Sequence, residues 1–167
     1  MNYVGNKWLN LPEKSVSHRT LLMYMNEQEL IPKNKFDLDA AKRLLEATPE
    51  QVSVVAFSLL EWIADMNWPV ALEIIHVLPK FYKELLPSIE QILINQKNDA
   101  IWKYWIISQL LIQFPKESLI NLLPVIQKYA DSVPNNEDEE DLKESALDFL
   151  DWYNKKECSS ITNSTTA

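Results

Sequence analysis

The chain has 167 residues, of which 47% are hydrophobic, and a formal net charge of −8. This length is typical of one domain with a sizeable core, and the acidity disfavours nucleic-acid binding, which needs a basic face. A single glycine, Gly5, excludes glycine-rich phosphate loops and dinucleotide turns, and a single cysteine, Cys158, excludes disulfides within the chain and thiol-based metal clusters.

The N-terminal segment, residues 1–29, is predicted to be an extension, and one helix is patterned from about Ser17 to Leu30. Its apolar patch, residues 21–25, is too short for a signal peptide or a membrane span. The lone cysteine also suits a reducing compartment. We therefore expect a cytoplasmic protein that does not enter the membrane.

Two capping motifs predict helices in the middle of the chain. Thr48-Pro49-Glu50-Gln51 combines a capping threonine, a proline in the first turn and a glutamine three residues after the cap. A helix is therefore predicted from this motif to about Ala64. Asn67-Trp68-Pro69 opens the next helix in the same way.

Three further helices are predicted towards the C-terminus. Asn98 or Asp99 is expected to cap a helix over residues 101–113, and Pro115 is expected to start another. The closing helix is predicted from apolar side chains that recur on one helical face, namely Leu142, Ala146, Phe149, Leu150 and Tyr153. Residues 156–167 are polar, with nothing to bury, and are predicted to be a disordered tail. The domain itself is expected to span residues 30–155.

An internal repeat refines the predicted fold. Leu78-Pro79-Lys80 recurs as Phe114-Pro115-Lys116 after 36 residues, and residues 85–89 (LLPSI) recur as residues 122–126 (LLPVI) after 37. Chance remains an alternative, because leucine and proline are common here. A period of this length with two helices per unit is typical of stacked helical hairpins. We predict an all-α fold, a short right-handed stack of antiparallel hairpins with about seven helices.

A polar stripe interrupts the first of the capped helices. Ser58, Glu61 and Asp65 lie on one side of an otherwise apolar helix. The two carboxylates repel each other, so the stripe is solvated, is paired with a cation such as Lys103, or holds one carboxyl with a raised pKa for acid–base chemistry. We favour a solvated or ion-paired stripe, because this is the usual fate of such carboxylates.

The next helix carries a weaker catalytic pattern. Glu73 and His76 share a face, and a histidine oriented by a carboxylate can act as a general base. His18 is the only other histidine, and no serine or threonine lies in a nucleophile motif. Catalysis is therefore disfavoured, and neither a metal nor a cofactor is expected.

The turn between these helices is the most specific local segment. Asp65 and Asn67 can satisfy free amides at the helix start while Trp68 anchors the hairpin, which is a sufficient structural explanation. Tryptophans at helical spacing are also core residues far more often than ligand cages. The functional alternative is a pocket at the hairpin ends, formed by Glu61, Asp65, Asn67, Trp68, Glu73, His76, Trp102 and Lys103.

The closing helix offers a second candidate surface. Opposite its apolar face runs an acidic stripe made of Glu137, Asp141, Glu144, Asp148 and Asp151. Such a stripe usually only keeps a helix soluble, but it can also attract a basic partner.

Three tryptophan-rich segments carry a resemblance to a known family. They are residues 31–37 (IPKNKFD), 60–71 (LEWIADMNWPVA) and 99–106 (DAIWKYWI). From about Leu30 to Tyr153 the chain resembles an uncharacterised bacterial family of all-helical domains of unknown function, allied to HEAT-like stacks. The resemblance implies a fold, and it brings no catalytic residues to this sequence.

These observations favour a non-enzymatic interaction module, an adaptor or an inhibitor of a basic protein, that binds its partner through a groove or the acidic helix. The alternative is a small-molecule-binding protein or hydrolase that uses the pocket at the hairpin ends. Nucleic-acid binding along the stack is a third hypothesis, which the net negative charge disfavours.

Overall fold

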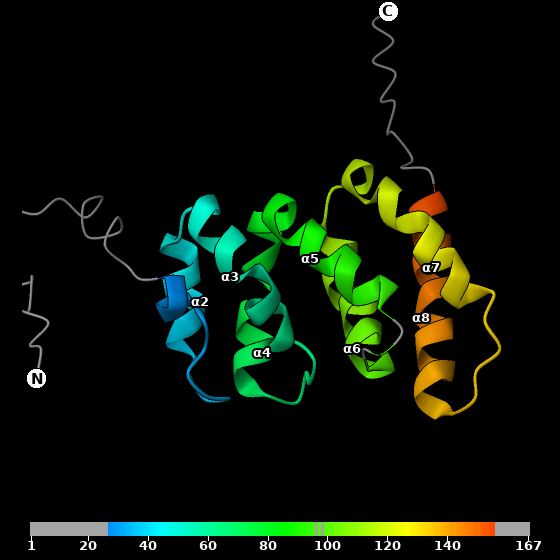
Figure 1. Ribbon diagram of the computed structural model, residues 1–167, viewed down its shortest axis with the longest axis horizontal. Coiled ribbons are helices and arrows are strands. Elements are labelled where there is room, and N and C mark those ends of the chain that lie inside the picture. The colour runs from blue at the N-terminus through cyan, green and yellow to red at the C-terminus, as the bar shows by residue number, and fades with distance from the viewer. Residues whose placement is uncertain (1–26, 96, 98, 156–167) are drawn as a thin grey trace, which may run out of the picture.

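The computed structural model describes residues 27–155 except residues 96 and 98. Within these residues the protein contains seven α-helices and no strand, which confirms the predicted all-α class. The helices follow one another in chain order along the long axis of the molecule (Figure 1). The predicted tail and almost all of the predicted N-terminal extension lie outside the described residues, and the right-handed, HEAT-like course of the stack stays a prediction.

An ion pair fixes the start of the described chain. The 3₁₀ helix η1 (Glu27–Leu30) is followed by a loop and by α2 (Asp39–Glu46). Arg43 on α2 reaches back to this loop, where its Nη2 lies 2.6 Å from Oδ2 of Asp37, and its Nε donates to the carbonyl of Glu29. The hydrogen bond from Arg43 lowers the pKa of Asp37 below its usual range. The charge-assisted hydrogen bonds of Arg43 therefore tie η1 and the loop to α2.

Helix α3 (Pro49–Glu61) begins where the capping motif predicted. The Gln51 amide donates to Oγ1 of Thr48 over 3.4 Å, and the Thr48 amide donates to Oε1 of Gln51 over 3.0 Å. This reciprocal pair is a complete capping box. The predicted end near Ala64 was wrong, because tight turns replace the α-helical bonds after Glu61, as when the Trp62 amide donates to the Leu59 carbonyl.

The next hairpin consists of α4 (Pro69–Ile74), the 3₁₀ helix η2 (Leu78–Phe81) and α5 (Tyr82–Ile94). The predicted proline start of α4 is confirmed, with Trp68 at the cap position and no side-chain capping bond there. The α5 helix then packs along α3.

The predicted helix over residues 101–113 is helical throughout but not uniform. Its cap is confirmed, since Oδ1 of Asp99 accepts from the Ile101 amide over 2.8 Å. The α-helix α6 (Ala100–Trp105) widens into the π-helical segment η3 (Ile106–Leu110) and then tightens into the 3₁₀ segment η4 (Leu111–Gln113). A π turn accommodates an extra residue, so it changes which side chains face the core.

The last hairpin brings the C-terminal helix back along α6. It contains the 3₁₀ helix η5 (Lys116–Leu122), α7 (Leu123–Ala130) and α8 (Glu137–Asn154). The predicted apolar face of α8 is confirmed, because Leu142, Ala146 and Phe149 are buried and pack with the rest of the core. Helix α8 packs against α6, η3 and α7.

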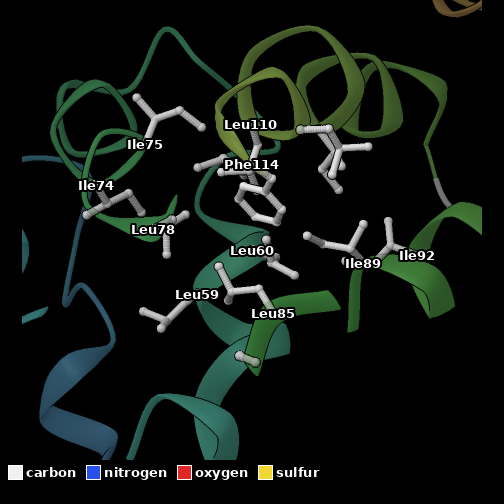
Figure 2. Close-up of a cluster of buried hydrophobic side chains, with 14 of the residues drawn as sticks. Leu59, Leu60, Ile74, Ile75, Leu78, Leu85, Ile89, Ile92, Leu110 and Phe114 are labelled. Atoms are coloured by element: carbon white, nitrogen blue, oxygen red, sulfur yellow. The ribbon is translucent and has the colours of Figure 1, made fainter. Parts of the chain in front are cut away.

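One continuous apolar cluster joins the elements into a single core. In Figure 2, side chains from α3, α5 and the end of the α6–η4 helix meet, among them Leu60, Leu85, Ile89 and Phe114. All four are buried. Burial of this apolar surface is the main force that holds the stack together.

The two halves of the predicted repeat occupy similar surroundings. In each of them a lysine after the proline donates to carbonyls near the C-terminal end of another helix. Lys80 Nζ donates to the Leu45 carbonyl over 2.7 Å, and Lys116 Nζ donates to the carbonyls of Trp152 and Lys155 over 3.1 and 3.0 Å. A cation at this place satisfies carbonyls that the helix leaves free. The repeat itself stays a prediction.

Candidate functional site

The seam between α3 and α6 is closed by aromatic side chains. Trp102 on α6 is buried, and its Nε1 donates to the Leu60 carbonyl over 2.9 Å. Its ring meets Phe57 edge to face at a centroid distance of 5.7 Å, and Trp62 meets Trp68 in the same manner at 5.4 Å. The tryptophans at this seam therefore pack as structural residues, with the polar atom of Trp102 satisfied.

The structure does not gather the predicted pocket residues at one cavity. Asp65 and Asn67 bind each other, since Oδ1 of Asp65 accepts from the amide and from Nδ2 of Asn67 over 2.9 and 3.0 Å. The side chains of Glu61, Glu73 and His76 are exposed. None of these residues, nor Trp68 or Trp102, lines the cavity in which Lys103 lies.

Lys103 follows Trp102 on α6 and lines a cavity of about 500 Å³. We call this space the Lys103 cavity; it lies between α6, the end of α7, the following loop and the first turns of α8. Its lining consists of Ala100, Lys103, Tyr129, Ser132, Val133, Asn135, Asn136, Asp138, Glu139 and Leu142.

The ammonium group of Lys103 lacks an anionic partner. The residue is only 4% exposed, and it forms no ion pair or hydrogen bond with another described residue through Nζ. Its Nζ lies 5.3 Å from the centroid of the Tyr129 ring. Burial lowers the pKa of Lys103, and the more distant charges of Asp99 and Glu139 oppose this shift. The pairing with Glu61 or Asp65, one of the alternatives for the polar stripe, is therefore not formed.

Hydrogen bonds hold the opposite wall of the cavity in place. Asn136 caps α8, where its Oδ1 accepts from the Glu139 amide over 2.9 Å. Glu139 returns the contact through Oε2, which accepts from the amide and from Nδ2 of Asn135, both over 2.8 Å. Lys143 donates to the Ser132 carbonyl over 2.8 Å. The loop between α7 and α8 is therefore fixed from both ends.

Tyr129 forms the floor under Lys103. Its hydroxyl donates to the Leu93 carbonyl at the end of α5, which orients the ring. Burial raises the pKa of this phenol, so the hydroxyl stays protonated and remains a donor at neutral pH.

The acidic stripe lies on the outer side of α8, where all five of its carboxylates are exposed. Only the last is paired with a described cation, since Asp151 lies 2.5 Å from Nζ of Lys155. The stripe borders a small hollow of about 170 Å³ between η3 and α8. We call it the α8 hollow; it is lined by Tyr104, Ser108, Asp141, Glu144, Ser145 and Asp148.

The hydroxyl of Ser108 lies in the wall of this hollow. Its Oγ is buried and has no hydrogen-bond partner among the described residues. Since buried polar atoms are nearly always paired, an unpaired one beside a hollow marks a place where an outside group can bind.

Sequence reasoning found Lys103 but assigned it to the wrong neighbours, and it missed Tyr129, Ser132 and Asn135. Two signals were present in the sequence. A lysine inside the apolar run of residues 100–107 is unusual, and the Asn135-Asn136 pair before five acidic residues is typical of a helix start.

No cluster of metal-ligating side chains occurs in the part of the chain that the structure describes. The same part contains no helix that is long and apolar enough to cross a membrane.

The fold defines an all-helical domain. A family model described as a domain of unknown function (DUF5071) matches residues 30–150. The chain belongs to this family, which confirms the predicted membership of a family of unknown function. No curated protein matches the chain.

Proposed function

We propose that this protein is a non-enzymatic interaction module of the cytoplasm, which binds a basic segment of another protein on the acidic face of α8. It would act as an adaptor or as an inhibitor of that partner. The observation that carries the proposal is the α8 hollow, where three exposed carboxylates surround a buried hydroxyl without a described partner.

The chemistry of the hollow suits the end of a lysine or arginine side chain. Asp141, Glu144 and Asp148 provide carboxylate oxygens, and an arginine can bind a carboxylate through two parallel hydrogen bonds. Ser108 Oγ can accept a further hydrogen bond from the same group. One inserted cation would thus pair with a carboxylate and with the buried hydroxyl at the same time.

An apolar contact lies beside these charges. Leu147 is 49% exposed, three residues after Glu144 and four before Asp151, so all three share one face of α8. An exposed leucine among carboxylates complements a basic segment that also carries an apolar side chain. The charges attract and orient such a partner, while the leucine contributes buried area.

Charge reversal tests the proposal. The triple variant Asp141→Lys, Glu144→Lys, Asp148→Lys is compared with a control that reverses three exposed carboxylates elsewhere, Glu73, Glu90 and Glu117. Each protein is immobilised and exposed to lysate from its own source cells, and the captured proteins are identified by mass spectrometry.

We expect a basic protein that the wild type and the control capture and that added salt releases. The α8 variant should bind it at least about tenfold more weakly, because several charge-assisted contacts are lost. Circular dichroism verifies that the variant is folded. Identical captured proteins for all three versions would contradict the proposal.

The structure gives less support to the other two hypotheses. A hydrolase at the hairpin ends requires Glu61, Glu73 and His76 to converge, and all three side chains are exposed. Nucleic-acid binding requires a basic surface, whereas α8 carries eight acidic residues and one lysine.

A further inference from the structure

We infer that the Lys103 cavity binds a small organic acid that also carries a hydroxyl or amino group, with the ammonium group of Lys103 as the counter-charge of the acid. The ligand class is therefore amino acids or hydroxy acids. This site is separate from the α8 hollow, because the two share no lining residue.

The unpaired ammonium group is the first argument for an acid. A charge taken out of water is costly unless an opposite charge or hydrogen-bond acceptors replace the lost hydration. Lys103 is 4% exposed, and its Nζ has no oxygen partner among the described residues. The Tyr129 ring, 5.3 Å from Nζ, offsets part of this cost by a cation–π interaction, but it does not neutralise the charge.

The size and shape of the space are the second argument. A cavity of about 500 Å³ falls within the range of small-molecule sites. Ala100 and Leu142 supply apolar wall, and Tyr129 supplies an aromatic face. A bound carboxylate at Lys103 would thus have room for carbon atoms beyond it.

The opposite wall of the cavity determines which other chemical groups the ligand carries. Asp138 and Glu139 line the cavity, and carboxylate oxygens accept hydrogen bonds from hydroxyl or amino groups. The same two carboxylates repel an anion with several charges, such as inorganic phosphate. A ligand with one carboxylate next to a hydrogen-bond donor would pair with Lys103 on one wall and with Asp138 or Glu139 on the other.

The walls of the cavity are held in place by hydrogen bonds within the protein. The bonds between Asn135, Asn136 and Glu139 fix the first turn of α8, and the hydroxyl of Tyr129 is anchored on α5. A wall that is already ordered does not lose conformational freedom on binding, which favours affinity for a small ligand.

The test measures the titration of Lys103 directly. In protein with ¹³C-labelled lysine, the Cε resonance of Lys103 is followed over pH without ligand and with L-serine, lactate, acetate, ethanolamine or inorganic phosphate. Serine and lactate carry both features, acetate has the acid alone, and ethanolamine has donors alone. Because the wild type is used, this measurement does not depend on whether any variant folds.

We expect serine or lactate to raise the pKa of Lys103, because a bound carboxylate stabilises its charged form. Either should bind about tenfold more tightly than acetate, since the hydrogen bonds to Asp138 and Glu139 add to the ion pair. Ethanolamine should leave the resonance unchanged. If phosphate binds as tightly as serine and lactate, or if no probe moves the titration, the inference is overturned.

Variants locate the binding. Lys103→Met keeps the length of the side chain and should weaken serine or lactate binding at least about tenfold. The matched control Lys97→Met changes an exposed lysine outside the cavity and should bind like the wild type. Equal affinity in the wild type and Lys103→Met would place the ligand elsewhere and overturn the assignment. Partner capture by the α8 hollow should be unaffected by Lys103→Met, so the two proposals can fail independently.

Discussion

Trp102 and Lys103 are neighbours on α6, yet they enter two seams of different character. Trp102 fills the seam towards α3, where its only polar atom donates to the Leu60 carbonyl. Lys103 enters the seam towards α7 and α8, where its charge faces a cavity. In the first seam Nε1 of Trp102 is hydrogen-bonded and water is excluded, so this contact stabilises the fold. The second leaves a charge and a space unfilled, which is the condition for binding something else.

The largest expected effect comes from truncating a leucine in each seam. Leu60→Ala should lower the free energy of unfolding by about 4 kcal/mol, because Leu60 is fully buried and its loss opens a new void. Leu142→Ala should cost only about 2 kcal/mol, because Leu142 already lines the Lys103 cavity and its loss enlarges an existing space.

Urea denaturation, analysed with the same m-value for both variants, measures the two losses in the free energy of unfolding. Equal losses for the two variants would mean that the seams are packed alike, and the contrast between them would not hold.

A smaller effect is expected from Trp102→Phe. The change removes the donor to the Leu60 carbonyl and part of the ring that meets Phe57, and it should cost about 1.5 kcal/mol. The midpoint of urea unfolding measures it, with Trp105→Phe as the control for loss of an indole that is only partly buried. A loss no larger than that of the control would show that the bond to Leu60 contributes nothing.

The smallest effect should come from Lys103→Met without ligand, within about 1 kcal/mol of the wild type, because a buried charge is often replaced by an apolar side chain without loss. Its pH dependence is more informative. The pKa of Lys103 in the folded protein is lowered from 10.5, so the unfolded state binds more protons between the folded pKa and 10.5. The wild type should therefore gain stability relative to Lys103→Met as pH rises through that interval.

Unfolding curves of both proteins at several pH values test this sign. A difference that stays constant up to pH 10.5 would show that folding leaves the pKa of Lys103 unchanged, and one that moves in the opposite direction would show that folding raises it.

Local signals predicted most of the helix starts. Thr48 and Gln51, Asp99 and Pro69 act within a few residues of their own positions, so capping chemistry alone determines what they do. The buried face of α8 was also predictable, because its spacing is a property of one helix.

The Lys103 cavity was not predictable in the same way. Its walls come from α6, α7, the loop after α7 and α8, and no local pattern states how these elements meet. The π turn at η3 adds to the difficulty, since an extra residue in a turn shifts the faces that regular helical spacing assigns. Lys103 was therefore placed with Asp65 and Trp68, whereas the packing of α7 and α8 places its ammonium group over the Tyr129 ring.

The lysine that ends the Phe114-Pro115-Lys116 motif also contacts residues that follow the family match. The match to the family ends at residue 150, but Lys116 donates to the carbonyls of Trp152 and Lys155, and its Nζ lies 4.9 Å from the centroid of the Trp152 ring. A chain shortened to the family boundary would lose all three contacts and would expose part of Phe149, which packs on Trp152. Anyone who produces the domain in isolation should carry it through residue 155.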